Sequence, residues 1–351
     1  MFFYWVIAVA ILSDLRYRLK ELAYRTQYAE LKERVEAAGQ LLPGTPGTLI
    51  QRDGTGYPYW YRVYYPLPGK KTEQFVCKDG DTQALDEARH RVEFAQWAAT
   101  QVKTLRKLEF QVADKGVASV MVELHNKQVL DAGLTLVGTL AYMCWLNEFG
   151  VTAVSARTQD IDLAARQHLK LGAPESFLEI VQATQLGFVP VPGMPSSEPP
   201  TSVKLQGADG LRVDLLTDGA KLGRSVPVPQ LMWHAQTMPF YAYLLEQPQK
   251  AAVLAGGHCV PVMLPSAQRF VWHKLYSSAA RRSFPEKADK DLMQAATLAA
   301  VLVELQDEDL SDSFDEVPAD MKKLVQARLP ALRRALAGHP QTREQFVETL
   351  A

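Results

Sequence analysis

Three aspartates stand in two runs of residues that otherwise have the composition of β-strands. Asp160 and Asp162 alternate with apolar residues, and Asp214 lies inside the apolar run 211–216. Because successive side chains of a strand point to opposite faces, Asp160 and Asp162 are expected to share one face. A third carboxylate from a neighbouring strand would repel this pair unless a cation neutralised the charges. Hard divalent cations such as Mg²⁺ prefer oxygen ligands, so the pattern predicts a cation site.

A short strand that turns directly into a helix precedes the acidic pair. Residues 134–137 are apolar, Gly138 and Thr139 form the turn, and a helical run follows as far as Phe149. The N–H groups at the start of a helix have no partner within it, so they can bind an anion. An anion site beside three carboxylates is suited to metal-assisted phosphoryl or nucleotidyl transfer. The alternative is that the aspartates lie on a solvated strand face and that Gly138 only ends the strand.

The order of these motifs resembles the signature of the polymerase-β nucleotidyltransferase superfamily. That signature combines an apolar strand, Gly-Ser or Gly-Gly, a helix, Asp-x-Asp, and a later acid among apolar residues. Here Thr139 stands in place of the usual serine or glycine and keeps a backbone amide and a hydroxyl. The stretches 262–275 and 287–294 resemble a bacterial family of stand-alone nucleotidyltransferase-fold proteins related to abortive-infection and toxin nucleotidyltransferases.

This resemblance implies an α/β (α+β) fold built on a polymerase-β-type core with a mixed sheet. Residues 1–112 would form an N-terminal module of a helix, an aromatic β-hairpin and a long helix. Residues 113–264 would be the catalytic core, and residues 265–351 a C-terminal helical domain.

The resemblance also implies roles for the acidic residues and the turn. Asp160 and Asp162 would bridge two Mg²⁺ ions, for which Mn²⁺ could substitute. Asp214 would complete the site of the metal that activates the acceptor, and it could take the acceptor's proton. Gly138 and Thr139 would hold the β- and γ-phosphates of a nucleoside triphosphate (NTP).

Three lysines belong to the same implied site. Lys274, with Lys287 or Lys290, would neutralise charge that develops on the leaving pyrophosphate. Lys274 lies in an otherwise apolar run, so its ammonium must reach solvent or meet an anion. Lys287 and Lys290 share a polar helical stripe with Asp291 and Gln294, for which a solvent-exposed face is the alternative.

Residues 56–77 are dense in aromatic and β-branched residues around a Pro-Gly turn, which predicts a β-hairpin. With Arg52, Arg62, Lys70 and Lys71, its aromatic residues could stack on bases and hold an RNA or tRNA acceptor. The alternative is that the tyrosines and tryptophan cover a core.

Apolar periodicity and turn residues predict the remaining elements. Helices are expected at 82–108, 117–130 and 176–186, and strand pairs at 203–205 with 211–216 and at 250–254 with 259–264.

After these strands, Pro265 and Ser266 should cap a helix in which His273 is a packed core residue. The next helix should bury Leu292, Met293, Ala296, Ala299 and Leu302. Residues 304–320 are predicted to be a solvated acidic linker, and residues 321–350 one or two helices broken at 338–340. A helix is also predicted in residues 13–40, with an apolar face of Leu15, Leu19, Leu22, Tyr28 and Leu31.

Bulk composition excludes few functions. The chain has 351 residues, 47% of them apolar, and a formal net charge of −1, so overall charge does not indicate nucleic-acid binding. Its three cysteines have no metal-site or disulfide spacing, which predicts a reducing, cytoplasmic environment without structural zinc. The apolar run 2–12 is shorter than the roughly 20 residues that span a bilayer, so no stable membrane insertion is expected. A buried or interfacial helix is the favoured interpretation of that run.

Three functions are compatible with these observations. The first is Mg²⁺-dependent transfer of a nucleoside monophosphate from an NTP to an acceptor hydroxyl or phosphate, with release of pyrophosphate. The second is the same chemistry on tRNA in a toxin or phage-defence enzyme. The third is an inactive nucleotidyltransferase fold that serves as a nucleic-acid or partner-binding module, against which the presence of all three aspartates argues. The base of the NTP, the acceptor and the oligomeric state do not follow from these patterns.

Overall fold

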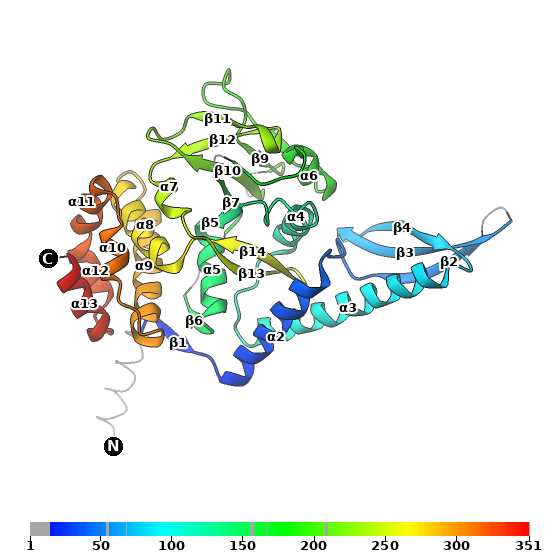
Figure 1. The fold of residues 1–351 in the computed structure, drawn as a ribbon, viewed down its shortest axis with the longest axis horizontal. Coiled ribbons are helices and arrows are strands. Elements are labelled where there is room, and N and C mark those ends of the chain that lie inside the picture. Colours follow the sequence, from blue (N-terminus) through cyan, green and yellow to red (C-terminus); the bar gives the residue numbers. More distant parts are fainter. Residues whose placement is uncertain are drawn as a thin grey trace.

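The computed structural model describes residues 15–53, 56–67, 69–154, 158–166, 168–207 and 210–350. Its main feature is a mixed β-sheet that has nine strands within these residues (Figure 1). The strand order is β11-β12-β10-β7-β5-β14-β13, with β9 beside the first half of β10 and β8 beside β9. The bounds are β5 Leu134–Val137, β7 Asp160–Ala165, β8 Val189–Val191, β9 Ser202–Lys204, β10 Arg212–Asp218, β11 Ser225–Val228, β12 Trp233–Met238, β13 Gln249–Ala255 and β14 His258–Leu264. The mixed sheet and its helices confirm the predicted α+β class.

The central strands are buried, which explains their sequences. Every residue of β5 is buried, and the apolar residues of β7 are buried too. Strands covered on both faces have continuous apolar runs, and such a run predicted the strand at 134–137. Helix α5 (Gly138–Glu148) begins at the next residue and packs on β5, β7 and β13. Both predicted strand pairs are confirmed as β9–β10 and β13–β14, whereas β11 and β12 were not predicted.

Two helices of the core are shorter than predicted. Helix α4 (Lys115–Asn126) packs on β13 and β14, and helix α6 (Phe177–Ala183) packs on α4. The two helices end before the predicted limits of 130 and 186, because a turn leads from α4 into β5 and another follows α6.

Residues 22–107, called the arm here, project from one side of the sheet (Figure 1). The arm consists of α2 (Leu22–Ala38), the antiparallel strands β2 (Thr48–Asp53), β3 (Pro58–Leu67) and β4 (Lys70–Lys78), and α3 (Thr82–Lys107). The predicted hairpin is confirmed as β3–β4, and the long helix agrees with the predicted one within a residue. Strand β2 was not predicted and completes a three-stranded sheet in the described residues.

The helix predicted in residues 13–40 begins later than its spacing suggested. Strand β1 (Tyr17–Leu19) pairs with β6 (Val151–Ala153), so the chain before α2 is extended. Leu15, Leu19 and Leu22 are exposed, contrary to the prediction, whereas Tyr28 and Leu31 are buried as predicted, together with Val35. The helix begins only at Leu22, although the apolar spacing starts earlier, because residues 17–19 pair with a distant strand. The run 2–12 lies outside the described residues.

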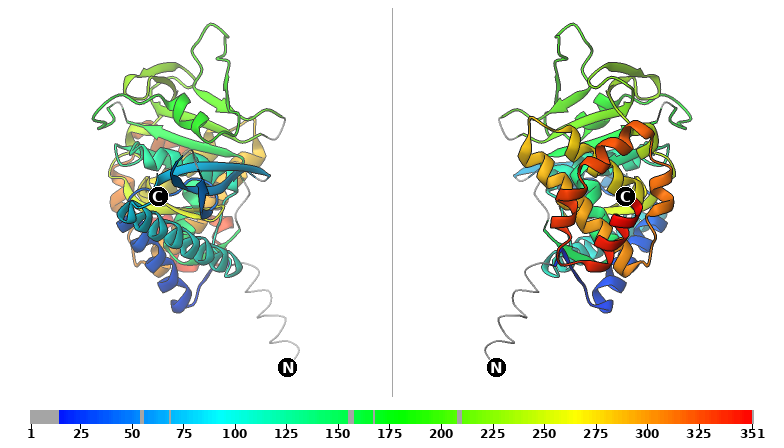
Figure 2. Two further views of the ribbon diagram at one scale, coloured as in Figure 1. Left: turned by 90° about the vertical axis from the view of Figure 1, so that its right-hand side faces the viewer. Right: turned by 90° about the vertical axis from the view of Figure 1, so that its left-hand side faces the viewer.

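Helices α8 to α13 gather on the side of the sheet opposite the arm (Figure 2). They are α8 Ala267–Ala280, α9 Pro285–Leu305, α10 Ser311–Asp315, α11 Ala319–Ala327, α12 Leu329–Ala335 and α13 Pro340–Leu350. The hydroxyl of Ser266 accepts a hydrogen bond from the Arg269 amide, which confirms the predicted cap. Residues 321–350 contain more helices than the predicted one or two, since the chain also breaks at Arg328. Met293 is exposed rather than buried, although its helix is otherwise covered on most sides.

The acidic stretch 304–320 is packed against the helices and is not a solvated linker. Leu310, Phe314 and Val317 are buried, and they anchor the stretch. Glu304 accepts hydrogen bonds from Tyr17 and Thr342. The prediction was wrong because it weighed the acids and overlooked the apolar residues between them.

One hydrophobic cluster extends from the arm through the sheet to the C-terminal helices of the described chain. The domain boundaries at 112 and 264 therefore remain predictions. Cys77, Cys144 and Cys259 are buried free thiols. Within the described residues, no helix combines the length and apolar character needed to cross a membrane.

Candidate active site

The three aspartates come together because β7 and β10 are parallel neighbours in the sheet. In the register of the two strands Asp162 lies opposite Asp214, and Asp160 lies opposite Arg212. Neighbouring strands are about 4.8 Å apart, and Asp160 precedes Asp162 by two residues on the same face. The sequence pattern predicted this grouping, and strand pairing supplies it.

Gly138 closes the site from the other side of β7. Strand β5 runs antiparallel to β7, and Val137 lies opposite Asp162. The next residue, Gly138, has a φ of 70°, and a Cβ atom built on it would collide with the Oδ2 atom of Asp162. Both the left-handed backbone and the close approach require glycine. The start of α5, including Thr139, is thereby held against the carboxylate.

The electrostatics of Asp162 show that the acids interact. Burial and, next, the charges of Asp214 and Asp160 raise the pKa of Asp162, whereas Lys274 and Arg281 lower it, and the result is a pKa of about 6. The carboxyl group therefore titrates in the range in which a bound cation would compete with a proton.

Asp214 is oriented by two neighbours that the sequence analysis did not single out. Its Oδ1 atom accepts hydrogen bonds from the hydroxyl of Ser202 on β9 and from Nε of Arg212, the latter at 2.7 Å. Arg212 also donates from Nη2 to the oxygen of Ser202 at 2.8 Å. The predicted strand began at residue 203, one residue after Ser202, and the observed pairing of β9 with β10 places Ser202 opposite Asp214.

The donor set fits a hard divalent cation. Three carboxylates on two adjacent strands offer only oxygen ligands, and their mutual repulsion raises the pKa of Asp162. In the described part of the chain, no three His, Cys, Asp or Glu side chains are already arranged to hold a metal ion. Asp214 instead pairs with Arg212, so a metal would have to share or replace that contact.

Lys274 meets an anion, as one of the two alternatives required, but this anion is a carboxylate of the protein itself. Its side chain is 8% exposed, and Nζ lies 2.7 Å from Oδ1 of Asp291, so it does not reach solvent. Nε of Arg281 lies 3.3 Å from the other oxygen of Asp291. Asp291 is 1% exposed, so the polar stripe is not an exposed face here. Its role as the partner of Lys274 and Arg281 was not predicted, although the spacing of seven residues between the two cations was a signal.

The two other predicted lysines differ in position. Lys290 donates from Nζ to the hydroxyl of Thr139 at 3.1 Å, which connects α9 to the first turn of α5. Burial lowers the pKa of Lys290, and the nearby charge of Lys274 adds to this effect. Lys287 is exposed, with its Nζ 5.7 Å from the Phe284 ring centre. Among the described residues, no hydrogen bond or ion pair connects Lys287 to the carboxylates.

Tyr241 is a buried neighbour of the carboxylates that the sequence analysis missed. Burial raises its pKa well above the ordinary value, and the charge of Asp162 is the next largest cause. Its ring packs edge-on against His273, with ring centres 5.2 Å apart. Burial lowers the pKa of His273 to about 3, so the imidazole is neutral. This confirms His273 as a packed core residue.

The raised pKa of Asp162 predicts a specific pH dependence of stability without added metal. The ordinary pKa of 3.8 applies to the unfolded chain, and the folded value is about 6. Folding is therefore penalised above pH 6 by up to about 3 kcal/mol, and the penalty disappears as the pH falls toward 4. Asp162→Asn removes the titrating group, so its melting temperature in EDTA should exceed that of the wild type at pH 7.5 and match it near pH 4. A difference that does not change with pH would contradict the assignment.

Comparison with known proteins assigns the chain to a family. Searches of curated proteins and of solved structures gave no match. A family model described as nucleotidyltransferase matches residues 115–319, a range that includes the three aspartates, Gly138 and the three lysines. Because this match covers more than half of the 351 residues, the chain belongs to this nucleotidyltransferase family and is an enzyme of the nucleotidyl-transferring class.

Proposed function

We propose that the protein transfers a nucleoside monophosphate from an NTP to an acceptor hydroxyl or phosphate, with Mg²⁺ bound by Asp160, Asp162 and Asp214. The observation that carries the proposal is the register of β7 and β10, which places Asp162 beside Asp214, with Gly138 against Asp162. This arrangement also supports the resemblance to the polymerase-β superfamily. Bound Mg²⁺ would offset the carboxylate charges and polarise the phosphate that is attacked.

The start of α5 provides the place for the triphosphate. Gly138 and Thr139 begin the helix, where backbone N–H groups lack partners within the helix and attract anions. Lys290 donates a hydrogen bond to the hydroxyl of Thr139, so its ammonium group lies at the same end of the helix. In the proposed complex this charge balances the phosphates and, more strongly, the pyrophosphate as it leaves.

Asp214 is the acid best placed to act on the acceptor. Arg212 and Ser202 fix the orientation of its carboxylate. An ionised carboxylate beside the attacking hydroxyl can accept its proton as the new bond forms. Lys274 acts from farther away in this scheme, since its ammonium is paired with Asp291 but still stabilises the charge of Asp162.

Each labelled NTP, incubated with the protein and Mg²⁺ with and without total tRNA, tests the proposal. Transfer of label to an acceptor or to the protein, with release of pyrophosphate, is the expected result. Label on tRNA alone would support the toxin or phage-defence role. Absence of transfer with all four NTPs, with Mg²⁺ and with Mn²⁺, would instead support an inactive binding module.

Mg²⁺ and the NTP are expected to bind together. Mg²⁺ keeps several ligands from water and phosphate, so a few carboxylates alone should hold it weakly. In thermal unfolding, Mg²⁺ alone should raise the melting temperature little, whereas Mg²⁺ with the correct NTP should raise it clearly. Equal shifts with NTP in EDTA and with NTP in Mg²⁺ would contradict a shared site.

Exposed aromatic residues on the arm favour RNA as the acceptor. Tyr57, Tyr65 and Phe75 are 72%, 46% and 54% exposed, so they do not only cover a core. Bases can stack on such rings without sequence preference.

The basic residues of the arm contribute less to a nucleic-acid surface than the sequence suggested. Arg62 is buried and donates to the carbonyl oxygens of Pro43, Thr45 and Pro46, so it is a structural residue. Arg52 and Lys71 both pair with Glu73.

A further inference from the structure

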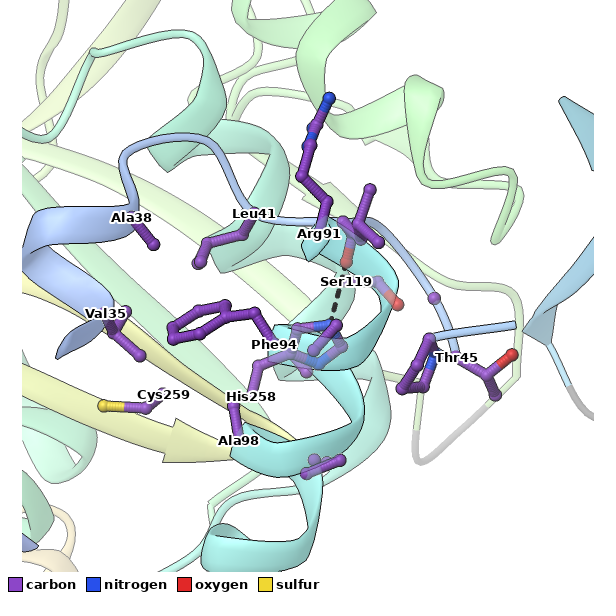
Figure 3. A pocket seen from close by; sticks show the side chains of 18 of the residues that line it. Val35, Ala38, Leu41, Thr45, Arg91, Phe94, Ala98, Ser119, His258 and Cys259 are labelled. Carbon is purple, nitrogen blue, oxygen red and sulfur yellow. Dashed lines mark hydrogen bonds between the residues drawn. The ribbon is translucent and has the colours of Figure 1, made fainter. Parts of the chain in front are cut away.

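A cavity of about 470 Å³ lies where the arm joins the sheet (Figure 3). Its walls come from α2, α3, the first half of α4, the loop 40–46 and the β13–β14 turn. Val35, Leu41, Phe94 and Ala98 supply apolar surface, and Figure 3 shows the Phe94 ring among these side chains. Cavities of this size with apolar walls and few polar groups are typical of small-molecule sites.

The cavity is remote from the proposed nucleotide site. His258 and Cys259, which begin β14, line the cavity. Met263, near the other end of β14, pairs with Thr135 of β5, and β5 ends opposite Asp162. Because β14 and β5 are parallel, the cavity lies near the beginning of these strands and the carboxylates lie near their end. A ligand in the cavity would therefore be distinct from the NTP.

The wall formed by the β13–β14 turn is closely packed. The amide of Gly256 donates to the carbonyl oxygen of Ala113 at 2.9 Å. A Cβ atom on Gly256 would lie 3.0 Å from Cβ of Ala118 and 3.1 Å from Cα of Lys115. The turn thus lies directly against the first turn of α4, and the cavity is bounded by firmly held backbone.

Two cationic side chains lie beside the cavity. Its lining includes Arg91 and Lys115 but no aspartate or glutamate among the residues that the structure describes. Both side chains are exposed, and neither makes an ion pair or hydrogen bond within the described ranges. Figure 3 shows Arg91 extending from α3 away from the apolar side chains. Burial mainly lowers the pKa of nearby Arg62 to about 10, and repulsion from Arg91 contributes. The surroundings therefore favour an anion.

His258 adds an unmet hydrogen-bonding group. Its Nε2 atom lies 3.0 Å from the carbonyl oxygen of Leu42, so Nε2 carries the proton and donates. Nδ1 is then an acceptor, and it is buried without a partner in the described structure. Burial lowers the pKa of the ring below its ordinary value. Buried polar atoms are nearly always paired, so this nitrogen points to a ligand that carries a donor such as a hydroxyl.

We propose that this cavity binds a small hydroxylated carboxylic acid with an aliphatic body. The aliphatic part lies against Phe94 and Leu41, the carboxylate faces Arg91 and Lys115, and the hydroxyl donates to Nδ1 of His258. Such a ligand would join the arm to the sheet, because its contacts come from α3, α4 and β14 together.

Calorimetric titration of the full-length protein tests the proposal with three probes: 3-hydroxydecanoate, decanoate without the hydroxyl, and decane-1,3-diol without the charge. One molecule of 3-hydroxydecanoate should bind per chain, the diol at least tenfold more weakly and decanoate several-fold more weakly. Equal affinity for the diol would overturn the anion site, equal affinity for decanoate would overturn the role of Nδ1, and absence of binding would overturn the whole proposal.

Variants locate the binding. The double variant Arg91→Gln with Lys115→Gln should weaken the binding of 3-hydroxydecanoate at least tenfold. Lys103 is an exposed lysine farther along α3, and Lys103→Gln should leave the affinity unchanged. Ala95→Leu places extra volume in the cavity and should abolish binding while the melting temperature without ligand stays the same. Equal affinities in all variants would show that the probe binds elsewhere and would overturn the proposal.

Discussion

Asp160→Asn or Asp162→Asn is expected to abolish nucleotidyl transfer while the protein remains folded. Each substitution keeps the size of the side chain and removes one negative charge from a group of three that lies on adjacent strands. A tenfold loss of rate corresponds to only about 1.4 kcal/mol in the barrier, and loss of a charged ligand should exceed this by several kcal/mol. Either variant with more than about a tenth of the wild-type turnover would contradict the assignment.

Asp218→Asn is the matched control for the aspartate variants. Asp218 lies on β10 as Asp214 does, but its Oδ1 atom accepts the amide of Ala242 at 2.8 Å. Asparagine keeps that acceptor, so stability and turnover should both stay close to wild type. Loss of turnover in this control as well would show that any change of charge on the strand is harmful, and the first result would lose its meaning.

Lys274→Met is expected to lower both stability and turnover. If the ammonium faced a phosphate, stability without ligand would stay unchanged, and if it faced solvent, stability would be equal or higher. The ion pair with Asp291 changes this expectation, because the substitution leaves a carboxylate that is 1% exposed with Arg281 as its one remaining ion-pair partner among the described residues. Breaking a buried pair costs about 3–5 kcal/mol, and the remaining arginine should reduce that loss. Turnover should fall roughly ten- to a thousandfold if the charge also supports the transition state.

A double variant separates the two effects of Lys274. Lys274→Met with Asp291→Leu removes both charges, and replacement of a buried pair by apolar residues is often close to neutral in stability. The melting temperature should therefore recover while turnover remains low. Recovery of turnover as well would show that Lys274 acts only through the fold. An unchanged melting temperature in the single variant would contradict the burial of the pair.

Local patterns predicted much of the framework of the site. The apolar run 134–137 followed by Gly138 predicted a strand and a helix with nearly the observed bounds. The alternation at Asp160 and Asp162 predicted a strand with both acids on one face, and β7 is that strand. The cap at Ser266 was also correct. These features depend on side-chain alternation, on the conformational freedom of glycine and on hydrogen bonds over a few residues, so they are written in adjacent residues.

Contacts between distant residues were decided by the tertiary structure alone. Tyr17–Leu19 formed a strand rather than the start of a helix because Val151–Ala153 was available to pair with it. Lys274 pairs with Asp291 of the next helix. The polar residues around Asp291 had suggested an exposed face, but Asp291 is buried. The register that sets Asp162 beside Asp214 likewise joins residues far apart in the chain. Spacing can show that such residues have the right chemistry, but packing of the whole chain determines which of them meet, because that choice depends on burying the largest apolar surface at once.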